Sequence, residues 1–196
     1  MWQYRTPGIP DELFERLDEV PITKEEVRVV QLSKGKLGSG YIVYDVGCGS
    51  GSVSVEAAYQ IGQTGKVFSI DIDPKAIELT NKNLAKFGIS NVNVILGDAK
   101  EKISDLPQAD SIFIGGTGGD TADIIKLCES KLKQGGRVVI GTILIETLFA
   151  VLNIIEKLKF SSVDITQVTI SKSRKTTTGT MMIARNPVTI ISATKI

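Results

Sequence analysis

Short apolar runs alternate along this chain with longer segments in which apolar residues recur every three or four positions. A short apolar run bounded by turn residues is typical of a buried parallel strand, and the periodic segments are typical of helices that cover a sheet. The strands expected from this pattern are 41–46, 66–70, 92–96, 111–115 and 137–144. The helices expected between and after them are 52–61, 74–87, 120–132 and 146–158. This alternation predicts an α/β fold, doubly wound, with a mostly parallel sheet and helices on both faces.

The two ends of the chain differ from its middle. Near the start, a helix is expected to begin at Thr23, which has the spacing of a capping box with Glu26. Near the other end, two strand-like runs, 162–170 and 180–191, are joined by SKSRKTTTG without a helix. They are expected to form an antiparallel hairpin at one edge of a seven-stranded sheet. The chain shows no internal repeat or linker, so residues 1–196 are expected to form a single domain.

Composition narrows the chemistry. The formal net charge of +1 predicts no general affinity for nucleic acid, and the absence of histidine removes the most frequent general base and metal ligand. Cys48 and Cys128 stand alone, so neither a metal site nor a disulfide framework is expected, and a reducing cytoplasm is the expected location. No run of about 20 apolar residues is present, so a membrane span is not expected.

The segment DVGCGSG, residues 45–51, follows the first predicted strand. In a doubly wound sheet this turn meets the ligand, and glycines together with free N–H groups at a helix start suit a negative group. A nicotinamide dinucleotide needs the spacing GxGxxG, but its third glycine is replaced here by Ser52, so the spacing is GxGxG. A turn with a purely structural role is the remaining interpretation.

Acidic residues follow the next two strands. Asp71 ends the second strand, where a carboxylate can accept hydrogen bonds from both hydroxyls of a ribose. Asp73 is an alternative candidate for this role, but Pro74 after it indicates that Asp73 caps helix 74–87. The sequence GDA, residues 97–99, ends the third strand and is a weak signal alone, because GD after a strand is often only a turn.

Three features follow three successive strands: the loop DxGxGxG, the acidic residue Asp71 and the sequence GDA. In this order they resemble the class I S-adenosylmethionine-dependent methyltransferases, which have a Rossmann-like fold. The resemblance implies S-adenosyl-L-methionine as cofactor, and it implies that Asp98 faces the adenine amino group, the Ala99 N–H a ring nitrogen and Thr23 the methionine end. The cofactor-binding residues implied in all are Thr23, Asp45, Gly47, Cys48, Gly49, Ser50, Gly51, Asp71, Asp98 and Ala99. Methyl transfer depends mainly on positioning and desolvation, so a chain without histidine can perform it.

A narrower resemblance covers nearly the whole chain. The segments PGIPDELF, ITKEEVR, DVGCGSG, GGTGGD, TILIET and GTMMIARNPV, in this order, resemble the decarboxylating precorrin methyltransferases of anaerobic cobalamin synthesis. The resemblance implies methylation of carbon 15 of a cobalt-precorrin, a tetrapyrrole, with loss of carbon dioxide from an acetate side chain, and it implies a homotetramer. The NPPY-like motif typical of amino-group methylation is absent after the fourth strand, where GTGGD stands.

Several residues are candidates for substrate contact, and none is assigned a catalytic role. Basic side chains near the predicted hairpin suit the carboxylates of a precorrin, or else form an ordinary solvated edge: Lys172, Arg174, Lys175 and Arg185. SKSRKTTTG is less glycine-rich than the family pattern, which leaves its shape open. Glu146 can face substrate or simply suit a helix dipole. Thr117 lies in the loop after the fourth predicted strand, where it can contact substrate. Alternatively, this loop is only a turn that leads to Asp120 as the cap of the next helix.

Two other functions fit the same cofactor site. A methyltransferase acting on transfer RNA would differ only in substrate, and the near-neutral charge argues against it. A non-catalytic module that binds S-adenosylmethionine would differ in having no turnover.

Overall fold

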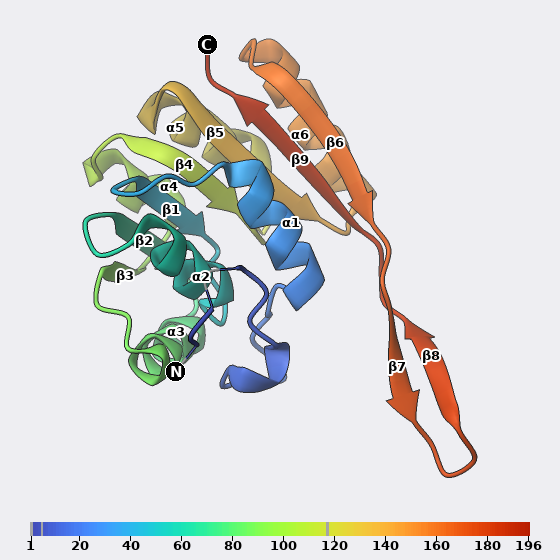
Figure 1. Cartoon of the computed structure of the whole chain (residues 1–196). Coiled ribbons are helices and arrows are strands. Elements are labelled where there is room, and N and C mark those ends of the chain that lie inside the picture. Colours follow the sequence, from blue (N-terminus) through green and yellow to red (C-terminus); the bar gives the residue numbers. More distant parts are fainter. Residues whose placement is uncertain (1, 5, 117) are drawn as a thin grey trace.

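The computed structural model describes residues 2–4, 6–116 and 118–196. Its main sheet has the strand order β3-β2-β1-β4-β5-β9-β6, flanked by helices (Figure 1). The strands are β1 Ile42–Val46, β2 Lys66–Asp71, β3 Val92–Leu96, β4 Ala109–Ile114, β5 Leu132–Thr142, β6 Ser161–Val168, β7 Ser171–Lys175, β8 Thr180–Ala184 and β9 Val188–Thr194. The α-helices are α1 Glu25–Gly35, α2 Ser52–Ile61, α3 Pro74–Phe87, α4 Ala99–Lys102, α5 Thr121–Lys131 and α6 Ile145–Lys157. The predicted doubly wound α/β fold is confirmed.

The sheet reverses its strand order at β1. Strands β1 to β5 are parallel, and β1 pairs with β2 on one side and with β4 on the other. The connections after β1 and after β4 therefore lead away in opposite directions. In such sheets a ligand crevice opens beyond the carboxyl ends of the strands at this point.

Alternate residues of β1 point into separate apolar cores on the two faces. Tyr44 belongs to the core covered by α5 and α6, where Ile125 and Val151 are fully buried. Val43 belongs to the core covered by α1 and α2, which contains Val27. Because both faces are covered, β1 reads as one continuous apolar run rather than as an alternating one.

The antiparallel pair predicted at one edge of the seven-stranded sheet is confirmed, but the last third of the chain is divided into more strands than predicted. Strand β9 lies between β5 and β6 and is antiparallel to both, so β6 forms the edge. The run 180–191, predicted as one strand, is two strands separated by Asn186 and Pro187, because proline cannot donate to a strand ladder. SKSRK, predicted as a connection, is strand β7, which pairs with β8 in a separate ribbon that projects from the body (Figure 1). We call this ribbon the arm.

The predicted capping box at Thr23 is wrong. Helix α1 begins at Glu25 and has no side-chain cap of its own. Its first N–H, that of Glu25, instead donates to the Asp11 carboxylate at 2.9 Å. The Thr23 carbonyl accepts a hydrogen bond from Arg28. A carboxylate from a segment 14 residues away has taken the role that the local pattern gave to Thr23.

The other predicted caps have mixed outcomes. Asp73 accepts from the N–H of Lys75 at 2.9 Å, so it caps α3 as expected. Asp120 stands at the start of α5 without a side-chain cap bond, because its carboxylate pairs with Lys100 at 2.6 Å. In the part of the chain that the structure describes, no helix combines the length and apolar character needed to cross a membrane.

Candidate functional site

The glycine-rich loop, residues 45–51, connects the end of β1 to α2, and two of its glycines, Gly47 and Gly49, pack against the protein's own backbone. A Cβ at Gly47 would lie 2.7 Å from the Gly116 carbonyl oxygen, and one at Gly49 would lie 2.6 Å from that of Pro21. Both glycines also have positive φ angles, 73° and 54°, which other residues disfavour. Packing inside the protein therefore explains why Gly47 and Gly49 are glycines, independently of any ligand that the loop binds.

The backbone N–H groups of this loop are also used inside the chain. Each N–H from Gly47 to Gly51 donates a hydrogen bond. The acceptors are the Ile70 carbonyl for Gly47 and Cys48, the Asp71 carboxylate for Gly49, the Pro21 carbonyl for Ser50 and the Cys48 carbonyl for Gly51. The N–H groups of these loop residues are therefore already used, whereas the free N–H groups expected at the helix start belong to the first residues of α2, which begins at Ser52.

Asp71 lies at the end of β2, partly exposed, beside this loop. Its Oδ2 accepts from the Gly49 N–H at 2.8 Å and its Oδ1 accepts from the Asp73 N–H at 3.0 Å. Each carboxylate oxygen can accept about two hydrogen bonds. Asp71 therefore fixes the loop and retains the capacity to accept two further donors.

Two predicted cofactor residues are buried beneath the loop. Asp45 accepts a hydrogen bond from the Ser54 hydroxyl. Burial raises the pKa of Asp45 to about 6, against the Ser54 hydrogen bond and with a smaller contribution from the charge of Asp71. The Cys48 sulfur lies 3.6 Å from the Thr80 hydroxyl, and burial raises the pKa of its thiol. Both side chains support the loop from inside, and the Cys48 thiol stays protonated.

The GDA sequence lies next to Asp71, because Asp71 is paired in register with Leu96 at the end of β3. Asp98 caps α4, which begins at Ala99. Sequence reasoning missed two apolar side chains beside these residues: Ile72 is 70% exposed and Leu96 is 50% exposed. Large apolar side chains left open at adjacent strand ends form a surface suited to a flat apolar group.

A cavity of about 850 Å³ opens near the carboxyl ends of β4 and β5. The segment before α1, the first turns of α1, the loops after β4 and β5, and the connection between β8 and β9 surround it. Its lining includes Pro21, Ile22, Thr23, Lys24, Val27, Gln31, Gly116, Gly141, Thr142, Leu144, Thr147, Arg185, Asn186 and Val188. Among the described residues that line it, none carries a carboxylate.

The cavity brings together one predicted cofactor residue and one predicted substrate residue. Thr23 and Arg185 both line it, although they are far apart in sequence. Glu146 lies outside the lining, in the first turn of α6, where an acidic residue suits the helix dipole. Thr117 lies outside the described residues. Gln31 and Asn186 line the cavity and were missed, since one polar residue in a helix and one in a turn leave no distinctive pattern.

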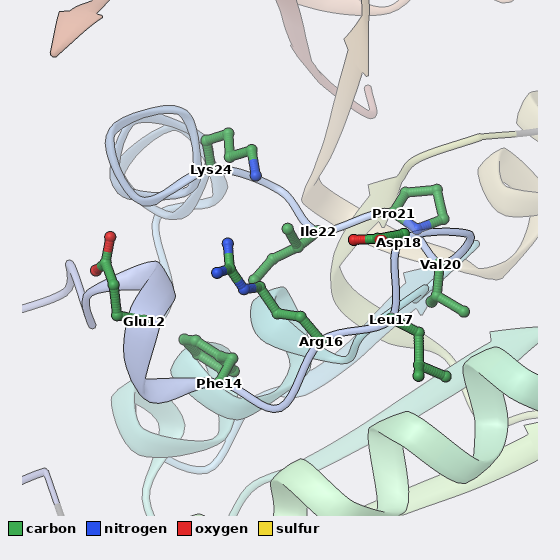
Figure 2. A pocket seen from close by; sticks show the side chains of 9 residues that line it. All are labelled: Glu12, Phe14, Arg16, Leu17, Asp18, Val20, Pro21, Ile22 and Lys24. Atoms are coloured by element: carbon green, nitrogen blue, oxygen red, sulfur yellow. The ribbon is translucent and has the colours of Figure 1, made fainter. Parts of the chain in front are cut away.

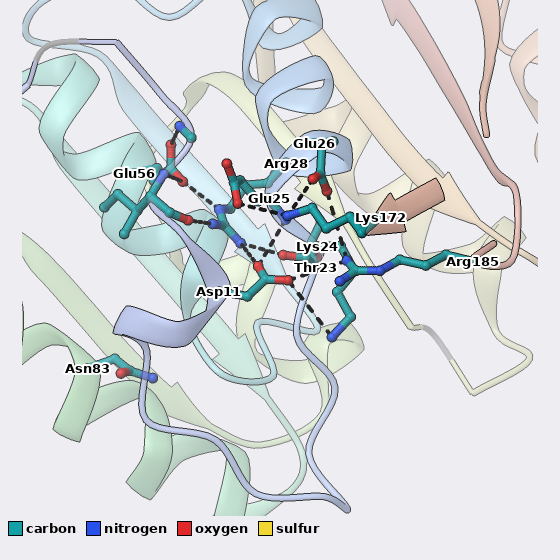
Figure 3. Close-up of polar contacts among 12 residues, drawn as sticks. Asp11, Thr23, Lys24, Glu25, Glu26, Arg28, Glu56, Asn83, Lys172 and Arg185 are labelled. Atoms are coloured by element: carbon teal, nitrogen blue, oxygen red, sulfur yellow. Dashed lines mark hydrogen bonds and ion pairs between the residues drawn. The ribbon is translucent and has the colours of Figure 1, made fainter. Parts of the chain in front are cut away.

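The predicted basic residues of the arm divide into two pairs. Lys172 contacts Glu26 at 2.5 Å and Glu25 at 3.1 Å, and Arg185 lies 3.9 Å from Glu26 (Figure 3). Burial works to raise the pKa of Glu26, but the hydrogen bond from Lys172 and the two nearby cations lower it. These contacts fasten the base of the arm to the start of α1. The other pair, Arg174 and Lys175, is exposed.

A buried ionic cluster holds the segment before α1 in place (Figure 3). Arg28 is fully buried, and its Nε lies 2.6 Å from Glu56 while its NH1 lies 3.4 Å from Asp11. Arg28 also donates to the carbonyls of Ile9 and Thr23. Because Glu56 belongs to α2 and Arg28 to α1, the cluster sets the position of the cavity wall relative to both helices.

A second hollow of about 680 Å³ borders the same segment (Figure 2). It shares Pro21, Ile22 and Lys24 with the larger cavity, so this stretch separates the two. Its charged residues have both signs, for example Glu12 and Arg16, and they indicate no preference for an anionic or a cationic ligand.

Comparison with known proteins assigns the family. The model of a precorrin methyltransferase domain matches residues 12–195. The chain belongs to this family. A probable cobalt-precorrin-6B C(15)-methyltransferase (decarboxylating) of Saccharolobus solfataricus is 46% identical over 196 residues, covering 99% of this chain and 98% of that protein. A protein of the same name from Thermoplasma acidophilum is 39% identical and covers 97% and 95%.

Solved structures of precorrin enzymes share the fold closely. A precorrin-6Y C5,15-methyltransferase from Geobacter metallireducens has a TM-score of 0.91 and 35% identity, covering 99% of this chain and 100% of that one. A precorrin 8W decarboxylase from Methanobacterium thermoautotrophicum has a TM-score of 0.89 and 37% identity, covering 94% and 98%. A tRNA (m1A58) methyltransferase from Aquifex aeolicus has a TM-score of 0.77 at 16% identity, which shows a shared fold alone.

Proposed function

We propose that this precorrin methyltransferase transfers a methyl group from S-adenosyl-L-methionine to carbon 15 of cobalt-precorrin-6B and releases carbon dioxide from an acetate side chain, in cobalamin biosynthesis. The observation that carries the proposal is the match, along nearly the whole of both chains, to relatives that bear this name. The family match over residues 12–195 supports a single domain spanning 1–196.

The donors and acceptors around the glycine loop fit S-adenosylmethionine. This cofactor has no phosphate, so it does not require the loop N–H groups that the chain has already used. Asp71 retains acceptor capacity for both ribose hydroxyls, and Ile72 and Leu96 offer an apolar surface to the adenine beside Asp98. When bound, the cofactor supplies an electrophilic methyl group on a positively charged sulfur. Thr23 lies on the cavity wall, where the methionine end would meet the substrate.

The cavity fits a large apolar ring with anionic side chains. Val27, Leu144 and Val188 give it apolar walls, and no described lining residue would repel a carboxylate. Lys24 and Arg185 stand at its edge, and both lie within 4.0 Å of Asp11. Arg174 and Lys175 on the exposed arm would meet carboxylates that remain outside. In a dry cavity, a transition state in which the sulfur charge disappears is favoured over the charged ground state.

The homotetramer is also a proposal. Met181, Met182 and Ile183 of the arm are between 37% and 63% exposed, although they are apolar strand residues. A two-stranded ribbon alone is only marginally stable in water, and an exposed strand edge favours pairing with another chain. We expect arms of neighbouring copies to cover one another, and light scattering of a Met182→Lys variant should show smaller assemblies than the parent protein.

A cytoplasmic location is also proposed, because the two cysteines form no disulfide. Cys48 and Cys128 are both buried and both free, as expected for a protein made in a reducing compartment.

The direct test is incubation with methyl-labelled S-adenosylmethionine and a panel of cobalt-precorrins, followed by mass measurement of each product. We expect one product that has gained the labelled methyl group and lost carbon dioxide. Labelling of transfer RNA in a parallel reaction would support the RNA methyltransferase instead. Cofactor binding without turnover on any substrate would support the non-catalytic module.

A further inference from the structure

The larger cavity contains a buried polar side chain that the packing of the protein leaves unused. Gln31 lies on α1, is 7% exposed and lines the cavity. Among the residues that the structure describes, none forms a hydrogen bond with its carboxamide. Its amide atoms are not among the fully buried, unpartnered side-chain atoms of the described residues, so the carboxamide is accessible from the cavity and open to a ligand.

The neighbouring strand is shaped around this amide. A Cβ at Gly141 of β5 would lie 2.2 Å from the amide nitrogen of Gln31, closer than two such atoms can pack. The glycine therefore lets the carboxamide, which lines the cavity, lie directly against β5. The nearby Thr142 hydroxyl is already occupied, since it donates to the Leu144 carbonyl at 3.3 Å and accepts from the Leu144 N–H at 3.0 Å. Gln31 is thus a donor on the cavity lining that remains free for a ligand.

We propose that Gln31 holds the acetate carboxyl group that the substrate loses as carbon dioxide. This inference rests on the proposed function. The cavity around Gln31 is apolar and its described lining contains no carboxylate, so a substrate carboxylate meets no repulsion there. The two cations that line the cavity, Lys24 and Arg185, lie 4.0 and 3.6 Å from the Asp11 carboxylate, which offsets part of their charge. One neutral donor orients such a carboxylate without solvating it as well as water does.

This arrangement favours loss of carbon dioxide. The bond between the carboxyl carbon and the methylene carbon breaks, and its electron pair passes into the conjugated ring. Carbon dioxide leaves uncharged, and the methylene becomes a methyl group after the ring system takes up one proton from water. A poorly solvated carboxylate is closer in free energy to the uncharged product than a carboxylate in water. Gln31 acts in this step as a positioning residue through its contact with the carboxyl group.

The test separates carbon dioxide release from methyl transfer. The full-length protein is given cobalt-precorrin-6B labelled in its acetate carboxyl carbons, together with methyl-labelled S-adenosylmethionine, and both labels are followed. For Gln31→Leu we expect carbon dioxide release to fall about ten- to a hundredfold, as for loss of a hydrogen bond to a charged group. Methyl transfer should fall less, so a methylated product that keeps its carboxyl group accumulates.

Gln31→Glu tests whether the substrate group at this position is negatively charged, because glutamate has almost the same shape as glutamine but carries a negative charge. At neutral pH it should release carbon dioxide more slowly than Gln31→Leu, because two carboxylates repel. It should recover as pH falls and the introduced carboxyl group takes up a proton. Gln134→Leu and Gln134→Glu, at an exposed glutamine on β5 in a different hollow, are the matched controls and should behave like the parent.

Each other outcome counts against the proposal. An unchanged ratio of carbon dioxide to methyl transfer in Gln31→Leu would show that Gln31 does not hold this carboxyl group. Faster turnover by Gln31→Glu than by Gln31→Leu would show that the amide oxygen accepts from a donor such as a pyrrole N–H. Failure of the parent protein to methylate any precorrin would refute the proposed function itself and this inference with it.

Discussion

Removing the Asp71 carboxylate should weaken cofactor binding far more than it weakens the fold. In the structure this carboxylate accepts from the N–H groups of Gly49 and Asp73, at 2.8 and 3.0 Å, and keeps room for two ribose hydroxyls. Hydrogen bonds to a charged group contribute about 1.5 to 3 kcal/mol each. Loss of two in Asp71→Ala should therefore lower affinity for S-adenosylmethionine on the order of a hundredfold or more.

The same substitution has a smaller cost in stability. It leaves the Gly49 and Asp73 N–H groups without an acceptor at a partly exposed site, which should lower the free energy of unfolding by about 1 to 3 kcal/mol. Calorimetric titration with S-adenosylmethionine measures the first effect, and denaturant unfolding of the free protein measures the second. Affinity should be compared at a temperature where both proteins are fully folded.

Asp73→Ala is the matched control, because it removes an adjacent carboxylate that only caps α3. It should cost about 1 kcal/mol of stability and leave cofactor affinity nearly unchanged. Equal affinity of Asp71→Ala and the parent would refute the assignment of the ribose to Asp71. Equal weakening by both variants would show that the effect comes from disturbing the loop rather than from lost contacts.

Four further predictions concern other parts of the molecule. Arg28→Met should lower the free energy of unfolding by about 3 to 5 kcal/mol, measured in urea, because two buried carboxylates lose their partner; a loss below about 1 kcal/mol would contradict this. Arg174→Ala with Lys175→Ala should raise KM for cobalt-precorrin-6B at low salt, and the effect should shrink as salt rises because exposed charges are screened over about 8 Å at physiological ionic strength; an unchanged KM would make these residues an ordinary solvated edge. The pKa of Asp45 is raised to about 6 in the fold, so its contribution to stability is complete below its unfolded pKa and is lost as pH rises through about 6; Asp45→Asn should flatten the unfolding profile in that range, and a parallel profile would be inconsistent with the raised pKa. Thr23→Ala should change stability by less than about 0.5 kcal/mol, since its side chain caps no helix, and should weaken cofactor binding measured by calorimetry; normal affinity would remove Thr23 from the site.

Local patterns predicted most of the fold because local interactions determine it. Helix α3 begins and ends where its sequence indicates, with Asp73 before it and Gly88 in the left-handed conformation after it. Strand β1 was recognised because burial on both faces makes it continuously apolar. Thr23 was misassigned as a cap because the true acceptor, Asp11, reaches Glu25 from another segment. Capping rules use neighbours in sequence and cannot detect such a carboxylate.

Motifs pointed to the glycine loop and to Asp71, and the fold brings the two together through the Gly49 N–H, although their role toward a cofactor stays a prediction. The use of the loop N–H groups could not be predicted, because it depends on partners such as Pro21 and Ile70, whose proximity is set by tertiary packing. Strand β7 was missed because SKSRK is polar, and its pairing with β8 outside the main sheet needs no apolar face. Gln31 was missed because its isolation appears only when the cavity around it is formed.

The position of β9 has a consequence for synthesis of the protein on the ribosome. Strand β9 is the last strand to emerge, yet it pairs with both β5 and β6. Until it arrives, a nascent chain has two open strand edges and an incomplete apolar core at Val139, whose neighbour Ile190 belongs to β9. Exposed edges and apolar surface promote aggregation of partly folded chains. The interval between synthesis of β5 and of β9, which includes the arm, is therefore when the nascent chain most needs protection by chaperones.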